Sequence, residues 1–344
     1  MYSDQKDMLL TLCVASVSFL SFKEKSILLN NLDSLSALAV LSIHDISQIV
    51  GRKFRNAQWD GTHAVREAEK SARILDAFGI TMLLHTQSAY PALLREIVNP
   101  PFALFYRGNA SCLGSSTVSV VGTRRMTVQG KQAVFSFARD AARDGVTVVS
   151  GLANGIDGEA HAGAVEACFD AMEAGRESGK TCAILPCGCD MVVPARHKRL
   201  AEKIIKTGGC LASEYLPGTP SESWRFVHRN RIIAALSPAT VVIEAPPGSG
   251  ALHTAQFALD YNRDVLFHES AFSERAAAVA ECVKQKLESD IALGKVSKSK
   301  IENTIERYRS DGAPVIKDYD DYCRCRAELP GMRSSKTIAQ EQLF

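Results

Sequence analysis

The sequence predicts an α/β fold, in which a parallel sheet carries helices on both faces and follows a small helical domain. Two observations predict it. From residue 117 onward, short apolar runs such as TVSVVG, VTVVSG, TCAILPCG and TVVIEA alternate with amphipathic stretches. This alternation is typical of the parallel strands and crossover helices of a Rossmann-like fold. Residues 1–86 instead repeat apolar positions at helical spacing, with little β-branched alternation.

These patterns divide the chain into three parts. We expect an N-terminal helical accessory domain over residues 1–86 and a Rossmann-like domain over residues 87–326. Within the second part, residues 269–306 form a charged insertion of helical character, and GAPVIKDYDDY after it indicates one more strand and the start of a helix. Residues 327–344 are polar and predict a flexible C-terminal tail.

The charge balance limits the classes of function. Forty lysines and arginines stand against 38 aspartates and glutamates in 344 residues, which leaves a net charge of +2. A uniformly basic nucleic-acid coat and an acidic disordered chain are both excluded, so any nucleic-acid site must be a local patch. The 46% of hydrophobic residues is typical of a globular protein with a substantial core.

The N-terminal apolar stretch MLLTLCVASVSFL, residues 8–20, resembles the core of a signal peptide in length. Its acidic flank and the lack of a small-residue cleavage site argue against secretion, and thirteen residues are too few to span a membrane. We therefore expect a buried helix in a cytoplasmic protein. The ten cysteines contain no CxxC pair, which favours buried free thiols over the alternative of a zinc site.

Glycine-rich turns follow several of the predicted strands. They are Gly122-Thr123-Arg124-Arg125, Ser150-Gly151 with Gly155, and Ser249-Gly250. In parallel sheets, ligands bind at the carboxyl ends of the strands, where turn amides and helix N-termini suit an anion. Ordinary exposed turns and helix caps remain the alternative. No P-loop, GxGxxG motif or catalytic triad is present.

Asp157 and His161 lie four residues apart on one predicted helix. Such a pair could serve as an acid–base couple or as half of a metal site. A structural role, with the carboxylate capping the helix start and bonded to the nearby histidine, is the commoner outcome and is the one we favour.

Basic residues concentrate between positions 196 and 231, where eight lysines and arginines against three glutamates give +5. The run Trp224-Arg225-Phe226-Val-His-Arg229-Asn230-Arg231 interleaves this charge with aromatic rings. Single-stranded nucleic acid is bound by this combination, because cations follow the phosphates while rings stack on bases. A solvated helix face with two core aromatics is the alternative.

The motifs VGTRR, SGLANGIDGEAH, ILPCGCDMVVP, LASEY, FVHRNRIIAALS, VVIEA and SGALHTA occur in this order over about residues 88–267. Together they resemble the DprA/Smf family of DNA-processing proteins. The resemblance implies a non-enzymatic homodimer that protects incoming single-stranded DNA and loads the RecA recombinase in natural transformation. It also implies that the domain over residues 87–326 binds DNA, through Gly122, Thr123, Arg124, Arg125, Ser150, Gly151, Gly155, Phe226, Arg229, Asn230, Arg231, Ser249 and Gly250.

Two other functions stay open. Related Rossmann-like proteins bind or hydrolyse nucleotides, in which case Glu214 or Glu244 would have to serve as the catalytic carboxylate. A scaffold that has lost DNA binding is the third hypothesis.

The C-terminal residues Gln340, Leu343 and Phe344 form a Q-x-x-L-F pattern that resembles the peptides that bind bacterial sliding clamps. Glutamine can bond at a pocket rim while the leucine and phenylalanine enter an apolar slot. Packing of these side chains on the protein's own surface is the alternative.

Overall fold

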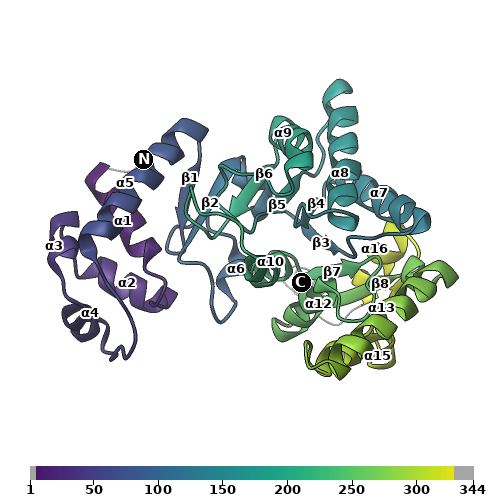
Figure 1. The fold of residues 1–344 in the computed structure, drawn as a ribbon. Helices are drawn as coiled ribbons and strands as arrows, with labels where there is room; N and C mark the ends of the chain where they lie inside the picture. The colour runs from purple at the N-terminus through teal and green to yellow at the C-terminus, as the bar shows by residue number, and fades with distance from the viewer. Residues whose placement is uncertain (1–4, 329–344) are drawn as a thin grey trace, which may run out of the picture.

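The computed structural model describes residues 5–328, and these contain one sheet of nine strands flanked by helices (Figure 1). The strands lie in the order β1-β2-β6-β5-β4-β3-β7-β8-β9. Their bounds are β1 Thr81–Leu84, β2 Ala103–Gly108, β3 Thr117–Val121, β4 Thr147–Ser150, β5 Thr181–Ile184, β6 Cys210–Ser213, β7 Ala239–Val242, β8 Asp264–His268 and β9 Val315–Ile316.

The sheet is parallel from β6 through β3 to β9, as the alternating strands and helices predict. One edge differs, because β2 pairs antiparallel with β6 and β1 pairs antiparallel with β2. No long crossover helix joins β1 to β2, and antiparallel neighbours need none. Strand β1 lies within residues 1–86, which were expected to be helical throughout, so the sheet begins earlier than the sequence indicates.

Helices cover both faces of the sheet because the strands alternate their buried side chains. Val118 and Val120 pack with α7 (Val128–Arg143), α8 (Ile156–Glu173) and α16 (Tyr319–Glu328). Val121 and Val149 point the other way and pack with α11 (Asn230–Ala235) and α12 (Gly250–Asp260). Helix α9 (Lys198–Lys206) buries Ala201 and Ile204 beside β6. This two-residue period is the one that a strand buried on both faces requires.

The N-terminal region contains α1 (Gln5–Ser16), α2 (Phe22–Asn30), α3 (Leu35–Val40), α4 (Ile43–Val50) and α5 (Gly61–Phe78). Serine caps start α2 and α4 with reciprocal capping boxes, and Asp60 caps α5. The apolar stretch at residues 8–20 is a buried helix as predicted, since Leu12, Cys13 and Val14 are fully buried in α1. These helices share one apolar cluster with β1 and β2, so they pack directly on the sheet edge.

The charged segment after β8 is helical, as predicted. It contains a short turn (Glu269–Phe272), α13 (Glu274–Ala292), α14 (Ser299–Glu302) and α15 (Ile305–Ser310). Strand β9 and helix α16 follow, again as predicted, and α16 continues to Glu328. The clamp-like residues Gln340, Leu343 and Phe344 lie outside the described residues.

Seven of the ten cysteines are buried free thiols, whereas Cys282 and Cys323 are exposed and Cys325 is half-buried. Among residues 5–328, no cluster of three or more histidine, cysteine, aspartate or glutamate side chains could hold a metal ion. Within the same range, no helix has the length and apolar character needed to cross a membrane.

Candidate nucleic-acid interface

The candidate site lies where the topology of the sheet reverses. Strand β3 is hydrogen-bonded to both β4 and β7. The chain leaves β3 through α7 toward β4, and it leaves β7 through α12 toward β8 on the other side. A crevice opens at the carboxyl ends of two such strands and is the usual ligand site of open α/β sheets. The Thr123 amide donates to the Glu244 carbonyl oxygen at 2.7 Å, so the loops after β3 and β7 meet there.

Glycines allow the loops of this rim to pack closely. Gly155 has φ +82°, and a Cβ there would overlap the carbonyl oxygen of Thr123. A Cβ at Gly151 would overlap the guanidinium of Arg229. Gly155 is therefore required by the contact between the loops after β3 and β4, and Gly151 by the close approach of the Arg229 side chain.

Two exposed cations stand on this rim. Arg124 and Arg125 follow β3 directly and are both exposed. The Arg124 guanidinium carbon lies 5.3 Å from the ring centroid of the half-buried Phe226, which belongs to α10 (Ser223–His228). The structure therefore joins two predicted site residues, more than 100 positions apart in sequence, into one cation and ring surface.

Arg229 lies beneath the rim and is only 3% exposed. Its Nη1 donates to the carbonyl oxygens of Gly151, at 2.6 Å, and Ile184, and its Nη2 lies 3.8 Å from a carboxylate oxygen of Asp157. Burial raises the pKa of Asp157, and the attraction of Arg229 opposes that rise. Arg229 therefore ties the loops after β4 and β5 to the start of α11.

Asn230 and Arg231 are also buried and face inward. The Asn230 amide donates to the Gly250 carbonyl oxygen at 3.1 Å, which fixes the loop after β7. Arg231 donates to the Asn99 carbonyl oxygen at 2.7 Å and pairs with the Glu214 carboxylate. Arg229, Asn230 and Arg231 were expected to contact DNA, but they are buried and hold together the loops that carry the exposed residues.

The remaining predicted residues divide between support and surface. The Ser150 hydroxyl donates to the Val120 carbonyl oxygen at 2.6 Å and is buried. Ser249 caps α12 beside the exposed Gly250. Arg225 lies over the rings of Tyr215 and Trp224, at 5.0 and 5.1 Å. It belongs to a second surface on α10, separate from that of Arg124 and Phe226.

His161 is fully buried and bonds to Thr181 rather than to Asp157, which lies against Arg229, so the two residues do not form the bonded pair that we favoured, although both have structural contacts. The Thr181 hydroxyl donates to the Val148 carbonyl oxygen at 2.8 Å, so its oxygen accepts from His161 Nδ1 at 2.7 Å. Burial lowers the pKa of His161 to about 3. The ring is therefore neutral, with its proton on Nδ1.

The two carboxylates that a nucleotide-hydrolysing enzyme would need are both engaged. Glu244 is 3% exposed and accepts from the Thr127 amide at 2.9 Å and the Thr127 hydroxyl at 2.5 Å, at the start of α7. Glu214 pairs with Arg231 and lies 3.1 Å from His228 Nδ1. Both carboxylates therefore hold structural contacts.

Sequence reasoning counted Arg196, Lys198 and Arg199 in the basic segment but did not place them in the site. All three are exposed. The neighbouring His197 ring lies 2.9 Å, through Nδ1, from the carbonyl oxygen of Leu152 in the loop after β4. The turn that carries Arg196, Lys198 and Arg199 therefore packs against the rim and extends its basic surface. A motif at the end of a strand could not predict this contact.

A family profile described as DNA recombination-mediator protein A matches residues 81–295. The chain belongs to this family. Curated relatives are also similar. Protein Smf of Synechocystis is 42% identical over 180 residues, which are 51% of this chain and 42% of that protein. Protein Smf of Borreliella burgdorferi is 29% identical over 261 residues, which are 76% of this chain and 79% of that protein.

Solved structures of this family share the fold. The X-ray structure of DNA processing protein A from Streptococcus pneumoniae has a TM-score of 0.64 and 26% identity, over 92% of this chain and 97% of that one. DNA processing protein A from Helicobacter pylori, whose structure was described for its single-stranded DNA binding mode, has a TM-score of 0.54 and 22% identity. The match covers 73% of this chain and 97% of that one. The family match begins at β1, where the sheet begins, and includes every rim loop. A DNA-processing role in recombination follows from membership of this family.

Proposed function

We propose that this chain binds single-stranded DNA along the rim at the carboxyl ends of β3, β4 and β7. One observation carries the proposal, namely the exposed Arg124 and Arg125 at the reversal point of the sheet, with Phe226 beside Arg124. Guanidinium groups follow the phosphates of a single strand and an aromatic ring stacks on a base. The neighbouring Arg196, Lys198 and Arg199 lengthen the cationic track.

We further propose that the protein acts without catalytic turnover, as a cytoplasmic homodimer that protects incoming DNA and loads RecA in natural transformation. The engagement of Glu214 and Glu244 in structural contacts supports a binding role over a hydrolytic one. Light scattering should report the mass of two chains in solution. Turnover of a nucleotide that is lost in E244Q, with folding retained, would contradict the proposal.

The DNA site is tested by removing the two rim arginines together. R124A/R125A should bind oligo-dT at least tenfold more weakly than the wild type, because two phosphate contacts of about 1 kcal/mol each are lost. The control R143A/R176A removes the same charge from exposed arginines at the other end of the strands, where β4 and β5 begin. Fluorescence anisotropy in low salt measures both. Equal affinities of the two double variants would overturn the proposed site.

RecA loading is tested separately, through the ATPase activity of RecA on single-stranded DNA. The wild-type protein should shorten the lag before RecA becomes active, and R124A/R125A should not, because loading requires the bound strand. A double variant that shortens the lag as well as the wild type would separate loading from this site.

We also propose that Gln340, Leu343 and Phe344 bind a sliding clamp. A peptide of residues 334–344 should bind with a dissociation constant on the order of micromolar, which corresponds to about 8 kcal/mol. L343A/F344A should abolish clamp retention while DNA binding stays intact. Equal retention of the variant and the wild type would show that the pattern is an accident.

A further inference from the structure

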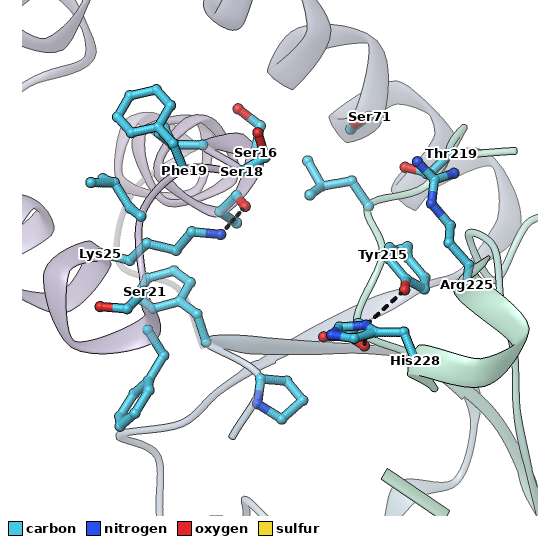
Figure 2. A pocket seen from close by; sticks show the side chains of 18 of the residues that line it. Ser16, Ser18, Phe19, Ser21, Lys25, Ser71, Tyr215, Thr219, Arg225 and His228 are labelled. Atoms are coloured by element: carbon cyan, nitrogen blue, oxygen red, sulfur yellow. Dashed lines mark hydrogen bonds and ion pairs between the residues drawn. The ribbon is translucent and has the colours of Figure 1, made fainter. Parts of the chain in front are cut away.

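A cavity of about 1110 Å³ lies between the N-terminal helices and the sheet domain, on the side of α10 away from the rim (Figure 2). One wall is formed by the turn between α1 and α2, by Lys25 and by residues around Trp59. The opposite wall is formed by Tyr215, Trp224, Arg225 and His228. The sequence pattern indicated single-strand binding for the run that contains Trp224 and Arg225, but not for the N-terminal wall, which comes from a segment far away in the chain.

Cationic groups face this cavity from both walls. Lys25 extends from α2 toward Tyr215 and His228 (Figure 2), and its Nζ donates to the Ala15 carbonyl oxygen at 2.7 Å. That bond uses one of the three ammonium donors. Burial lowers the pKa of Lys25 to about 8, although Glu214 attracts the charge. The Arg225 guanidinium pairs with the exposed Glu222 at 3.0 Å and donates to the Pro220 carbonyl oxygen, while within residues 5–328 its buried Nε has no hydrogen-bond partner.

Aromatic rings line the same wall. Trp224 is 54% exposed, a large fraction for an indole, and its ring lies edge-on to Tyr215 with centroids 6.2 Å apart. Arg225 lies over both rings. Trp59 borders the cavity from the other side. Flat rings beside guanidinium and ammonium groups are the features that bind a nucleotide, as a base on the ring and a phosphate on the cation.

Helix α10 connects this cavity to the rim. Its Phe226 contacts Arg124 on the rim, whereas its Trp224, Arg225 and His228 line the cavity. A strand that crosses α10 from the rim therefore meets the cavity next. Carboxylates also border it, but Glu214, the one beside Arg225 and His228, is already paired with Arg231.

We propose that this cavity is a second subsite of the single-strand path, in which bases stack on the aromatic wall and Lys25 and Arg225 bind the phosphate. The inference rests on the proposed function at the rim. A free mononucleotide has the same base and phosphate groups, so the experiment below compares a mononucleotide with a DNA strand as the ligand of the cavity.

Tryptophan fluorescence provides the direct test, because the only two tryptophans of the chain, Trp59 and Trp224, both line the cavity. W224F leaves Trp59 as the sole reporter, on the N-terminal side and away from the rim. Oligo-dT of increasing length, from about 4 to about 16 nucleotides, should quench Trp59 once the strand is long enough to reach the cavity. Saturated binding of the longest oligomer without a change in Trp59 emission would overturn the inference.

K25M provides the second measurement, with K23M as its matched control on the exposed side of the same helix. K25M should weaken binding of the longest oligomer roughly tenfold, the effect of one charge-assisted contact, and should spare the shortest one. It should also raise the thermal midpoint, because a buried charge is removed. Equal affinities of K25M and K23M for the longest oligomer would contradict the subsite. If K25M does not fold, the Trp59 quenching experiment alone decides.

The outcomes also separate this inference from the proposed function. If R124A/R125A loses all oligomer binding and the emission of Trp59 in W224F does not change, the cavity subsite is contradicted. The proposed DNA site at the rim is then supported. Insensitivity of binding to R124A/R125A would remove the proposed function itself. Quenching of Trp59 by thymidine monophosphate as strong as by the longest oligomer would make the cavity a site for free nucleotides and overturn the strand path.

Discussion

At the scale of single residues, the structure separates arginines that the sequence cannot tell apart. Arg124, Arg229 and Arg231 all stand in basic motifs at strand or helix ends. Arg124 is exposed, whereas Arg229 and Arg231 are 3% and 8% exposed and bind carbonyl and carboxylate oxygens. The sequence pattern reports charge but not burial, because burial depends on loops contributed by β4, β5 and β6. The sequence therefore predicted that these strand-end motifs come together, but not which of their arginines are exposed.

Arg229 should behave as a structural tie. R229A leaves the Asp157 carboxylate buried without its cation and the Gly151 and Ile184 carbonyl oxygens without their donor. We expect the free energy of unfolding to fall by about 3–5 kcal/mol, as when one partner of a buried pair is removed. Urea unfolding measures it, with the exposed Arg199 as the control site. If the loss in R229A is within about 1 kcal/mol of that in R199A, Arg229 does not have this role.

Gly155 and Gly175 both have positive φ, +82° and +61°, but Gly155 also has a ψ of −131°, a conformation that only glycine adopts readily. An alanine Cβ at Gly175 meets nothing within 4 Å, whereas at Gly155 it overlaps the Thr123 carbonyl oxygen. G175A should cost about 1 kcal/mol for its backbone conformation alone. G155A should lower the free energy of unfolding by more than G175A does. It should also weaken oligo-dT binding, because the loop that carries Arg124 must move. Unfolding and anisotropy titrations check both, and equal DNA affinities would show that Gly155 does not position the rim.

At the scale of elements, the strands were predictable wherever a glycine turn and an amphipathic helix follow an apolar run. Strands β3, β4, β5 and β7 satisfy that pattern. Strand β1 does not, because its four residues TMLL follow directly on the helix α5 and no crossover helix comes after it. Its strand character comes from pairing with β2, a tertiary contact that no local pattern records.

Helix α8 carries a buried histidine whose titration should affect stability. Burial, helped by the positive charges of His197 and Arg229, lowers the pKa of His161 to about 3. Between about pH 6.5 and pH 3 the unfolded chain then binds a proton that the folded chain does not. The contribution of His161 to the free energy of unfolding is therefore fully present above about pH 6.5. It is lost as the pH falls below that value, by up to about 1.4 kcal/mol per pH unit.

H161Q should therefore flatten the acid limb of the stability curve. The comparison with wild type isolates His161 from the nearby Asp157, whose raised pKa acts with the opposite sign. Urea unfolding at several pH values measures the slope, and H63Q removes an exposed histidine as the control. Parallel curves for H161Q and the wild type would show that His161 does not carry this acid sensitivity.

At the scale of the whole molecule, the N-terminal helices and the sheet share one apolar cluster. Leu12 of α1, Phe105 of β2 and Leu211 of β6 belong to that cluster. The Ser71 hydroxyl of α5 donates to the Pro217 carbonyl oxygen at 3.0 Å, across the inner end of the cavity. The sequence predicted the N-terminal helices and the parallel strands, but it could not predict the cavity between them, since helical periodicity does not specify which neighbour a helix packs against.

The charge of the whole molecule makes the salt dependence of binding a quantitative test. The net charge is only +2, so long-range attraction is weak and the response to salt must come from cations at the site. Five exposed cations border the rim, namely Arg124, Arg125, Arg196, Lys198 and Arg199. For a single strand, each phosphate contact contributes about −0.7 to the slope of log affinity against log salt, which predicts a slope of about −3.5. R124A/R125A should reduce its magnitude by about 1.4, and R143A/R176A should leave it unchanged. A wild-type slope near zero would mean that stacking alone holds the strand, and a slope beyond about −7 would require more cations than this rim presents.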